Sequence, residues 1–315
     1  MLRHERREIP TVEQTQKNKK FLLVDICYLA LIIAPLVCGM VIKILTNVPE
    51  NGISIVGARI YFEIPMPLQP LRITEAQVNS WLVLLSIFGI CLYMTHGLSV
   101  RYPTRRQHAI EWAIEKVEQM VDDSMGAFFA GYAPFIMAIL VLSALSSLLA
   151  LLGLYPPTSD INVVAGWAIL VFGLITYYKL KGGVLNYLKG FTEPIFIMTP
   201  LNILGELATP ISMAFRHYGN VLSGSVIAVL IAAALQGASS WIFGWLPGFL
   251  GEIPFLQIGL PAVLSVYFDV FSGCMQAYIF AMLTMLNISG GFPVEAYEKR
   301  QQKKLAKSKE IKINN

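Results

Sequence analysis

Long apolar runs separated by short polar segments dominate this sequence, and their lengths predict its helices. A membrane-crossing helix needs about 20 mostly apolar residues. Six runs reach that length, at residues 21–45, 78–100, 126–152, 161–180, 200–236 and 259–288. We therefore predict an all-α fold, a polytopic membrane protein with about six membrane helices. The first run is too long, and too weakly followed by small residues, for a cleaved signal peptide, so we expect a retained anchor helix.

The last two runs are longer than an upright span requires. As one helix, residues 200–236 would measure about 55 Å, whereas the hydrocarbon core of a bilayer is about 30 Å thick. Such a helix must either break or lie steeply tilted. The connection at 237–260 is itself apolar, aromatic and interrupted by Pro and Gly, so we expect it to rest in the outer interface. We predict two long, steeply tilted helices joined as a hairpin.

Two shorter segments have other patterns. Alternating apolar residues in the loop at 46–77 predict a short hairpin or extended piece, and its prolines argue against a helix. In the segment 103–123, apolar residues recur at helical spacing and charged residues occupy other faces. This pattern predicts an amphipathic helix in the cytoplasmic interface, with Trp112 near the headgroups. A helix that binds a soluble partner is the alternative.

Composition and charge placement agree with a membrane location. Only 14% of the residues are charged, against about 25% in soluble domains. Most Lys and Arg residues lie before residue 21 or within 101–116, 179–189 and 299–312, and the alternate connections hold few or none. By the positive-inside rule, both termini are cytoplasmic. The predicted division is a polar N-terminus (1–20), an additional membrane helix (21–45), an outer loop (46–77), a membrane core (78–292) and a basic cytoplasmic tail (293–315).

Several classes of protein are excluded by the remaining features. The net charge of +4 comes from the cytoplasmic flanks and fits contact with membrane lipid, so no nucleic-acid partner is expected. The four cysteines lie in apolar runs without a CxxC pair, which indicates small packing residues and not disulfides or metal ligands. The sequence has no HExxH motif and no glycine-rich phosphate loop, so we expect no metal, no cofactor and no enzyme activity of its own.

A permanent charge lies inside the fifth apolar run. Residues 200–236 contain only two formal charges, Glu206 and Arg216. A guanidinium is not neutralised at ordinary pH, and at membrane depth it costs about 3 to more than 10 kcal/mol. A chain keeps such a residue only against a protein partner or a water-filled path. Ion transport is therefore the default function that the sequence predicts.

Polar residues accompany this arginine at helical spacing. One face of the fifth helix carries Thr209, Ser212, Arg216, Asn220 and Ser223, and one face of the sixth carries Asp269, Ser272, Gly273 and Gln276. Paired polar stripes can line a hydrated path, although each serine could instead bond a neighbouring helix. His217 points about 100° away from Arg216, which favours a helix contact over a proton relay.

Several motifs resemble subunit a of bacterial F-type ATP synthase, a component of its Fo sector. RHYGNVLSG follows PLNILGELATPISMAF, and YFDVFSGCMQAYIFAMLTMLNIS comes later. The similarity runs from about Ile73 to Ile288 and includes ITEAQVNSWLVLL, LLGLYPPTSDINVVAGWAIL and KGGVLNYLKGF. Residues 1–45 resemble no segment that we can assign.

The resemblance implies an ion-translocating, non-catalytic stator subunit in a bacterial inner membrane, with the proton as the expected ion. Its partners would be a ring of c subunits, b-type peripheral stalk subunits and the remainder of the F1Fo complex. Arg216 matches the essential arginine, which holds the passing ring carboxylate ionised and separates two half-channels. The other matched residues are Gln276, which packs against the arginine, Asn220 on the outer route, Glu206 on the cytoplasmic route, and Asp160 with Asn162 near the outer entry.

One departure from the family concerns the outer half-channel. The family usually places a Glu or a His nine residues after the arginine, and the other of the two seven residues before the glutamine. Here those positions are Ser225 and Asp269. Asp269 would act alone or through water, which bears on the pH dependence of ion entry and on the identity of the ion.

Two other functions remain as alternatives. A standalone ion channel or secondary transporter would need its own substrate site, and the sequence has no inverted repeat to support one. A membrane-embedded hydrolase is disfavoured because the serine at LSGS lacks a paired histidine.

Overall fold

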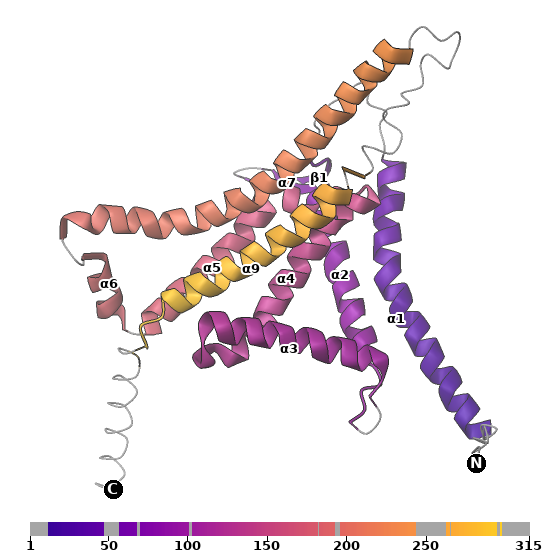
Figure 1. Ribbon diagram of the computed structural model, residues 1–315, viewed down its shortest axis with the longest axis horizontal. Coiled ribbons are helices and arrows are strands. Elements are labelled where there is room, and N and C mark those ends of the chain that lie inside the picture. Colours follow the sequence, from indigo (N-terminus) through magenta and orange to yellow (C-terminus); the bar gives the residue numbers. More distant parts are fainter. Residues whose placement is uncertain are drawn as a thin grey trace. The chain divides into compact units, whose positions relative to one another are not determined.

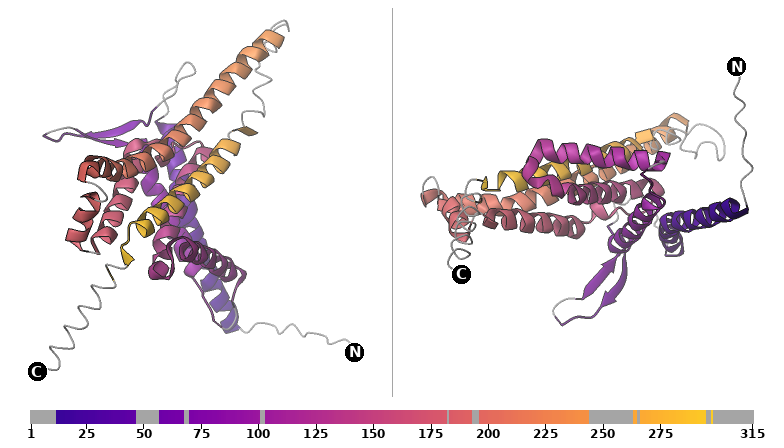
Figure 2. Two further views of the ribbon diagram at one scale, coloured as in Figure 1. Left: turned by 60° about the vertical axis from the view of Figure 1, so that its left-hand side comes forward. Right: turned by 90° about the horizontal axis from the view of Figure 1, so that it is seen from below.

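The computed structural model describes residues 12–46, 57–67, 70–100, 103–181, 183–192, 196–243, 263–264, 266–294 and 297. The chain forms two compact units, and Figures 1 and 2 show their helices. The first unit comprises Met1–Asn47 and Trp81–Ala113, and the second comprises Val48–Ser80 and Ile114–Asn315. Each unit therefore joins segments that are distant in the sequence.

The prediction of six membrane helices is confirmed. Within the described residues, six helices are long and apolar enough to cross a bilayer. These spans are Leu23–Leu45, Glu75–Thr95, Phe128–Leu152, Ile161–Lys181, Phe196–Ile242 and Tyr267–Gly290. The helices are α1 (Val12–Leu45), α2 (Glu75–Thr95), α3 (Arg105–Met125), α4 (Ala133–Leu148), α5 (Ile161–Lys181), α6 (Val184–Thr192), α7 (Thr199–Phe243) and α9 (Gly273–Gly290). Short 3-10 turns are Ala127–Tyr132, Leu149–Leu152, Pro157–Ser159 and Phe196–Met198, and Tyr267–Ser272 is a π-helix.

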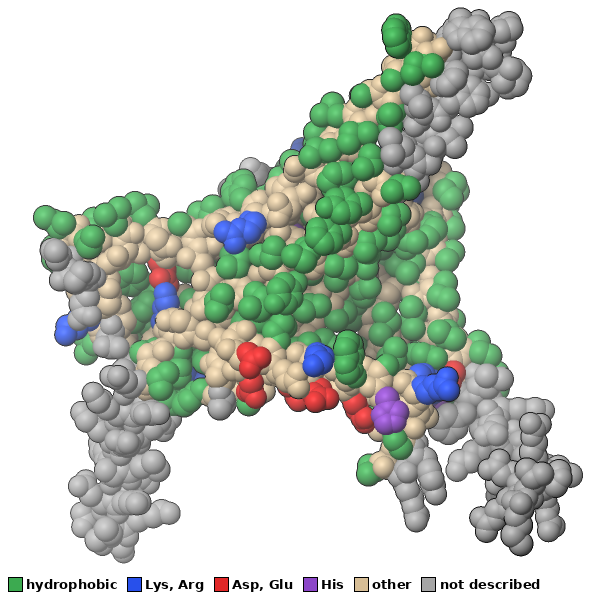
Figure 3. Space-filling model, in the orientation of Figure 1, with side chains coloured by type: hydrophobic (Ala, Val, Ile, Leu, Met, Phe, Trp, Pro, Cys, Tyr) green, Lys and Arg blue, Asp and Glu red, His purple; other side chains and the backbone are tan. Residues whose placement is uncertain are grey.

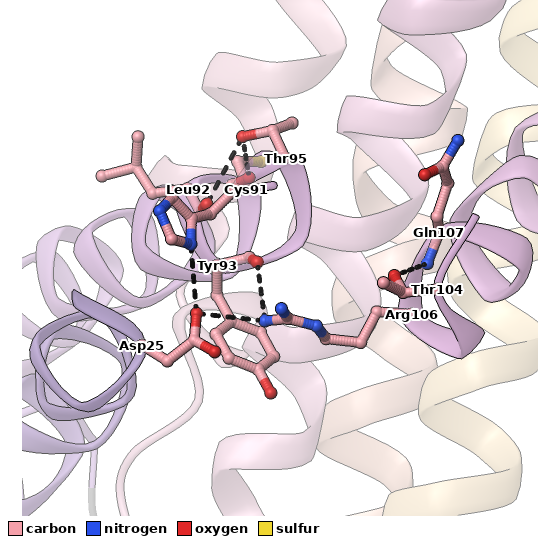
Figure 4. Close-up of polar contacts among 9 residues, drawn as sticks. Asp25, Cys91, Leu92, Tyr93, Thr95, Thr104, Arg106 and Gln107 are labelled. Atoms are coloured by element: carbon pink, nitrogen blue, oxygen red, sulfur yellow. Dashed lines mark hydrogen bonds and ion pairs between the residues drawn. The ribbon is translucent and has the colours of Figure 1, made fainter. Parts of the chain in front are cut away.

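In the first unit, α1 packs closely on α2 at Gly89, and a polar cluster around Asp25 holds α1 near the end of α2. A Cβ atom added to Gly89 would lie 3.0 Å from Cγ1 of Ile32, so a larger residue would push the helices apart. Near one end of α2, the carboxylate of Asp25 accepts a hydrogen bond from Nη1 of Arg106 and pairs with Nδ1 of His96, each at 3.2 Å (Figure 4). The hydrogen bond to Asp25 raises the pKa of Arg106, so this cation stays charged at any physiological pH.

The second unit packs α4 against α9 and α5 against α7. Its core is made of apolar side chains from these four helices and from the second half of α3, including Ile136, Val171, Phe280 and Met285. A Cβ added to Gly273 would lie only 2.7 Å from Cβ of Ser147. Glycine at that position therefore sets the distance between α4 and α9.

The predicted hairpin in the loop at 46–77 is confirmed. Strands β1 (Ile60–Ile64) and β2 (Leu71–Thr74) pair antiparallel, with Glu63 opposite Arg72 and an irregularity between Ile60 and Phe62. Nε of Arg72 lies 3.0 Å from Oε1 of Glu63. Strand β2 runs directly into α2, so the hairpin extends from the start of that span.

The predicted amphipathic helix at 103–123 is α3. Val117, Val121 and Met125 are buried at four-residue spacing, whereas Trp112 is 63% exposed. Acidic side chains gather on the surface over this helix (Figure 3). Its place in the cytoplasmic interface stays a prediction.

Helix α7 is longer than predicted and bends along its course (Figure 1). It has 45 residues, which correspond to about 68 Å, and Pro210 lies inside it. The connection predicted at 237–260 begins later than expected, since α7 continues through 237–243. One glycine costs a helix only about 1 kcal/mol, and no proline occurs before Pro247. The rest of that connection, and the start of the predicted sixth run, lie outside the described residues.

The cysteines are Cys27, Cys38, Cys91 and Cys274. All four are free thiols on exposed positions. The interpretation of these residues as packing residues is therefore wrong for the described part of the chain, where none of the four is buried.

Candidate functional site

Arg216 lies on an uncovered face of α7. Its side chain is exposed, as are those of Phe215 and Ser212, whereas Ala214 and His217 on the other side of the helix are buried. No hydrogen bond or ion pair joins Arg216 to another residue in the described part of the chain. The surface over α7 and α9 in the view of Figure 3 is largely hydrophobic. An unpaired guanidinium on such a surface is available to an anionic group outside this chain.

Two residues of the predicted polar stripes meet beside this face. Nδ2 of Asn220 on α7 donates a hydrogen bond to Oε1 of Gln276 on α9 at 2.5 Å, and Gln276 is 2% exposed. This bond links the helix that carries Arg216 to its neighbour. It also gives the buried side-chain amide of Gln276 a hydrogen-bond partner, without which its burial would be costly.

Asp269 lies in the π-helix at Tyr267–Ser272 and is half-buried. The sequence argument placed Asp269 and Gln276 on one face because seven residues are two α-helical turns. A π-helix has wider turns, so the seven-residue rule does not hold across this segment. Gly224 of α7 faces the side chain of Phe268, so the π-helix packs on α7.

The two predicted serines are both exposed on α7. The hydroxyl of Ser225 donates a hydrogen bond to the carbonyl oxygen of Leu222 in its own helix at 2.8 Å. Ser212 lies one turn before Arg216. Ser212 shares the exposed face of Arg216, whereas Ser225, nine residues after Arg216, lies about 180° away around the helix.

Glu206 forms an ion pair with Lys179 of α5. Nζ of Lys179 lies 2.8 Å from Oε1 and 2.6 Å from Oε2 of Glu206, and the side chains are 25% and 16% exposed. The pair lines a cavity of about 220 Å³ together with polar groups that include Thr209 and Asn287. The start of α7, the end of α5 and the end of α9 meet there, on the side predicted to be cytoplasmic.

The cavity continues into a second hollow of about 460 Å³. Tyr187 of α6 lines this hollow, which shares Lys179 and Glu206 with the first cavity. Burial, and then the negative charge of Glu206, raises the pKa of Tyr187, so its phenol stays protonated at neutral pH. Polar groups therefore extend from the surface to the Lys179–Glu206 pair.

Asp160 and Asn162 lie at the other end of α5. Oδ1 of Asp160 accepts hydrogen bonds from the backbone nitrogen and from Nδ2 of Asn162, at 2.9 and 3.0 Å. This is the geometry of a helix N-cap, which satisfies donors at the start of α5. Because 19 residues separate Asp160 from Lys179, the two polar sites lie about 28 Å apart along the helix axis, close to the thickness of a bilayer core.

Sequence reasoning missed two residues near Asp160. Tyr155 donates a hydrogen bond to the carbonyl oxygen of Ser159, and burial, followed by the charge of Asp160, raises its pKa. Glu75 is 4% exposed, and its Oε1 has no hydrogen-bond partner in the described part of the chain. The sequence feature that could have identified Glu75 is its position as a carboxylate immediately before an apolar run.

Six apolar helices, an isolated arginine on one of them, and polar sites near opposite ends of the bundle define a polytopic membrane protein of the ion-transport class. The family model described as ATP synthase A chain matches residues 77–289, which is more than half of the chain. The chain therefore belongs to the ATP synthase subunit a family. The match begins after α1 and the hairpin, which both lie outside it.

Curated relatives agree with this family. ATP synthase subunit a of Geobacter sulfurreducens is 30% identical over 232 residues, which cover 71% of this chain and 91% of the relative. The subunit a of Bacillus pumilus is 33% identical over 213 residues, covering 64% and 84%. ATP synthase subunit a 1 of Crocosphaera subtropica is 26% identical over 230 residues, covering 72% and 90%.

Proposed function

We propose that this chain is the ion-translocating stator subunit of an Fo sector, with Arg216 between two half-channels that open to opposite sides of the membrane. The observation that carries the proposal is the exposed guanidinium of Arg216 on α7, which no described residue pairs with. A fixed cation lowers the pKa of a carboxylate that passes it, so a ring subunit must release its ion there. The cation also repels ions that would move directly between the half-channels.

The half-channels are assigned to the two polar sites at the ends of α5. The Lys179–Glu206 cavity is the cytoplasmic route, and the region of Asp160, Asn162 and Asp269 is the outer route. The Asn220–Gln276 bond links α7 to α9 beside Arg216, Ser212 lines the arginine face, and Ser225 is assigned to the outer route. The partners are the c-ring, b-type peripheral stalk subunits and the rest of the F1Fo complex, and both termini are cytoplasmic.

A standalone channel is the second candidate, but the position of Arg216 disfavours it. A channel formed by one chain would enclose its selectivity group within its own helices. Arg216 is instead exposed on α7 in the described part of the chain, where a group of another protein can meet it. An acidic ring subunit supplies the countercharge that this surface lacks.

The test is Arg216→Ala in the complete complex reconstituted into liposomes. ATP-driven ion uptake is measured under H⁺ and Na⁺ conditions, with assembly checked by the subunit composition of the purified complex. We expect coupled pumping to fall at least about 100-fold, because an electrostatic group of this kind supplies several kcal/mol. Arg105→Ala, an exposed arginine at the start of α3, is the matched control and should pump as the parent does. Unimpaired pumping by assembled Arg216→Ala complex would refute the proposal.

Asp269→Asn tests the outer route separately. The amide has nearly the same shape but carries no charge at any pH, so ion entry from the outer side should slow about tenfold or more. ATP synthesis driven by an imposed gradient reports this entry step. An unchanged rate across a wide range of outer pH would remove Asp269 from the route.

A further inference from the structure

The ion pair between Lys179 and Glu206 is the shortest one in the described part of the chain. Nζ of Lys179 lies 2.8 Å from Oε1 and 2.6 Å from Oε2 of Glu206, so one ammonium group contacts both oxygens of the carboxylate. Each of the other ion pairs among the described residues joins a single carboxylate oxygen, at 3.0 Å or more. The ammonium of Lys179 therefore occupies the position that a metal ion takes when it binds a carboxylate with both oxygens.

The end of α9 leaves room for the lysine side chain. A Cβ atom added to Gly291 would lie 2.8 Å from Cε and 3.1 Å from Cγ of Lys179. A larger residue at position 291 would therefore push the lysine away from Glu206. The side chains of Lys179 and Glu206 are only 25% and 16% exposed, so the surrounding helices shield the pair from solvent. The ammonium is thus held on Glu206 by packing as well as by charge.

Oxygen-bearing groups surround this pair in the two cavities that it lines. Thr209 and Asn287 line the cavity of about 220 Å³, and Tyr187 and Asn202 line the hollow of about 460 Å³. A water molecule takes about 30 Å³, so both spaces are large enough for several water molecules. Carboxylate, amide and hydroxyl oxygens, together with water, are the ligands that hard metal cations prefer. Without Lys179, the carboxylate of Glu206 would be open to such a cation.

Lys179 supplies the positive charge that balances Glu206 in these cavities. No other described residue that lines either cavity carries a formal charge. Lys181 lies two residues further along α5, and its Nζ is 4.5 Å from the ring centre of Tyr178 and 5.2 Å from that of Tyr177. Loss of the Lys179 ammonium would therefore leave the carboxylate of Glu206 as the single charge of the described lining.

We infer that Lys179 determines the ion specificity of the cytoplasmic route, because its ammonium keeps metal cations off Glu206 and leaves the route to protons. This inference rests on the proposed function, and it identifies the proton as the ion that the route carries. A metal cation must either keep its water shell or exchange it for oxygen ligands. Near Glu206 the strongest ligand is already occupied, and the ammonium repels a second cation. A proton moves along hydrogen-bonded water and needs no such ligands.

Lys179→Gln in the complete complex is the principal test, because glutamine keeps much of the side-chain length but removes the charge. ATP-driven proton uptake is measured in liposomes with the F1 sector outside, so that the cytoplasmic route faces the added salt. NaCl is compared with choline chloride at equal ionic strength, about 0.1 M. We expect sodium to leave the parent rate unchanged and to slow the variant about threefold or more, because a Na⁺ ion can then bind Glu206.

Three further variants separate the charge of Lys179 from other effects. Lys179→Arg restores the cation and should be as insensitive to sodium as the parent. Lys181→Gln removes a cation that lies over tyrosine rings at the same end of α5, and it should also be insensitive. The double variant Lys179→Gln with Glu206→Gln lacks the carboxylate, so its sensitivity to sodium should disappear. Each rate in sodium is compared with the rate of the same variant in choline.

Equal rates in sodium and choline for assembled Lys179→Gln would overturn the inference. Sodium sensitivity that persists in the double variant, or ATP-driven Na⁺ uptake by the parent complex, would overturn it as well. Lys179→Met, which keeps the apolar stem beside Gly291, replaces the glutamine variant if that variant does not assemble. Failure of both variants to assemble would show a structural role and would reject the inference. With pumping lost in Arg216→Ala, these results reject only this inference, whereas normal pumping by Arg216→Ala would reject the proposed function itself.

Discussion

At the scale of residues, the sequence identified charged groups in apolar runs but not their partners. Arg216 and Glu206 were visible because any charge in such a run needs an explanation. Lys179 was counted only as a cytoplasmic loop charge, and its ion pair with Glu206 depends on how α5 packs on α7. The 100° offset of His217 from Arg216 was predictable, but its Nδ1, unpartnered in the described part of the chain, was not, because the groups around it come from three other helices.

Substitutions of Lys179 and Glu206 are expected to have coupled, non-additive effects on the stability of the complex. Lys179→Gln or Glu206→Gln alone leaves a half-buried charge unpaired, so each should destabilise the purified complex by about 1–3 kcal/mol. The double variant should lose less than the sum of the two, with a coupling energy of about 1 kcal/mol or more. Thermal unfolding of the four proteins measures this cycle. Additive losses would mean that the pair contributes no coupling energy.

At the scale of elements, length and periodicity predicted the spans, the hairpin and α3. They did not predict where α7 ends, because 237–243 contain apolar and small residues that either a helix or a loop accepts. They also missed the π-helix at Tyr267–Ser272, since sequence patterns are compared with periods of 3.6 and 2.0 only. The face assigned to Asp269 depended on that unrecognised change of winding.

Gly273 is expected to be essential for the packing of α4 on α9. Gly273→Ala places a methyl group 2.7 Å from Cβ of Ser147, and because that atom is held to the backbone of α4, the helices must separate. We expect a loss of about 1–3 kcal/mol in thermal stability. Gly166→Ala on α5 is the control, because its added Cβ meets nothing within 4 Å and alanine favours the helix by about 1 kcal/mol. Equal stability of the two variants would show that the interface of α4 and α9 can accommodate the added methyl group.

At the scale of the whole molecule, charge distribution predicted a topology and motif resemblance predicted the family, which the match at residues 77–289 confirmed. The helix α1 lies outside that match, and its contacts with α2 through Ile32 and with α3 through Asp25 were not predictable from either source. The uncovered face around Arg216 could not be predicted either. The exposure of α7 depends on how the other helices pack on it, which the sequence pattern does not give.

The most direct measurement of the central claim is photo-crosslinking from the arginine face. Phe215 is 61% exposed next to Arg216, and p-benzoylphenylalanine can replace it with little change of shape. In the assembled complex, irradiation is predicted to join this chain to a c subunit, whereas the same group at Tyr177 of α5, which is 56% exposed, should give no such product. Absence of the c-subunit product at position 215 in fully assembled complex, or equal yields at both positions, would contradict the account.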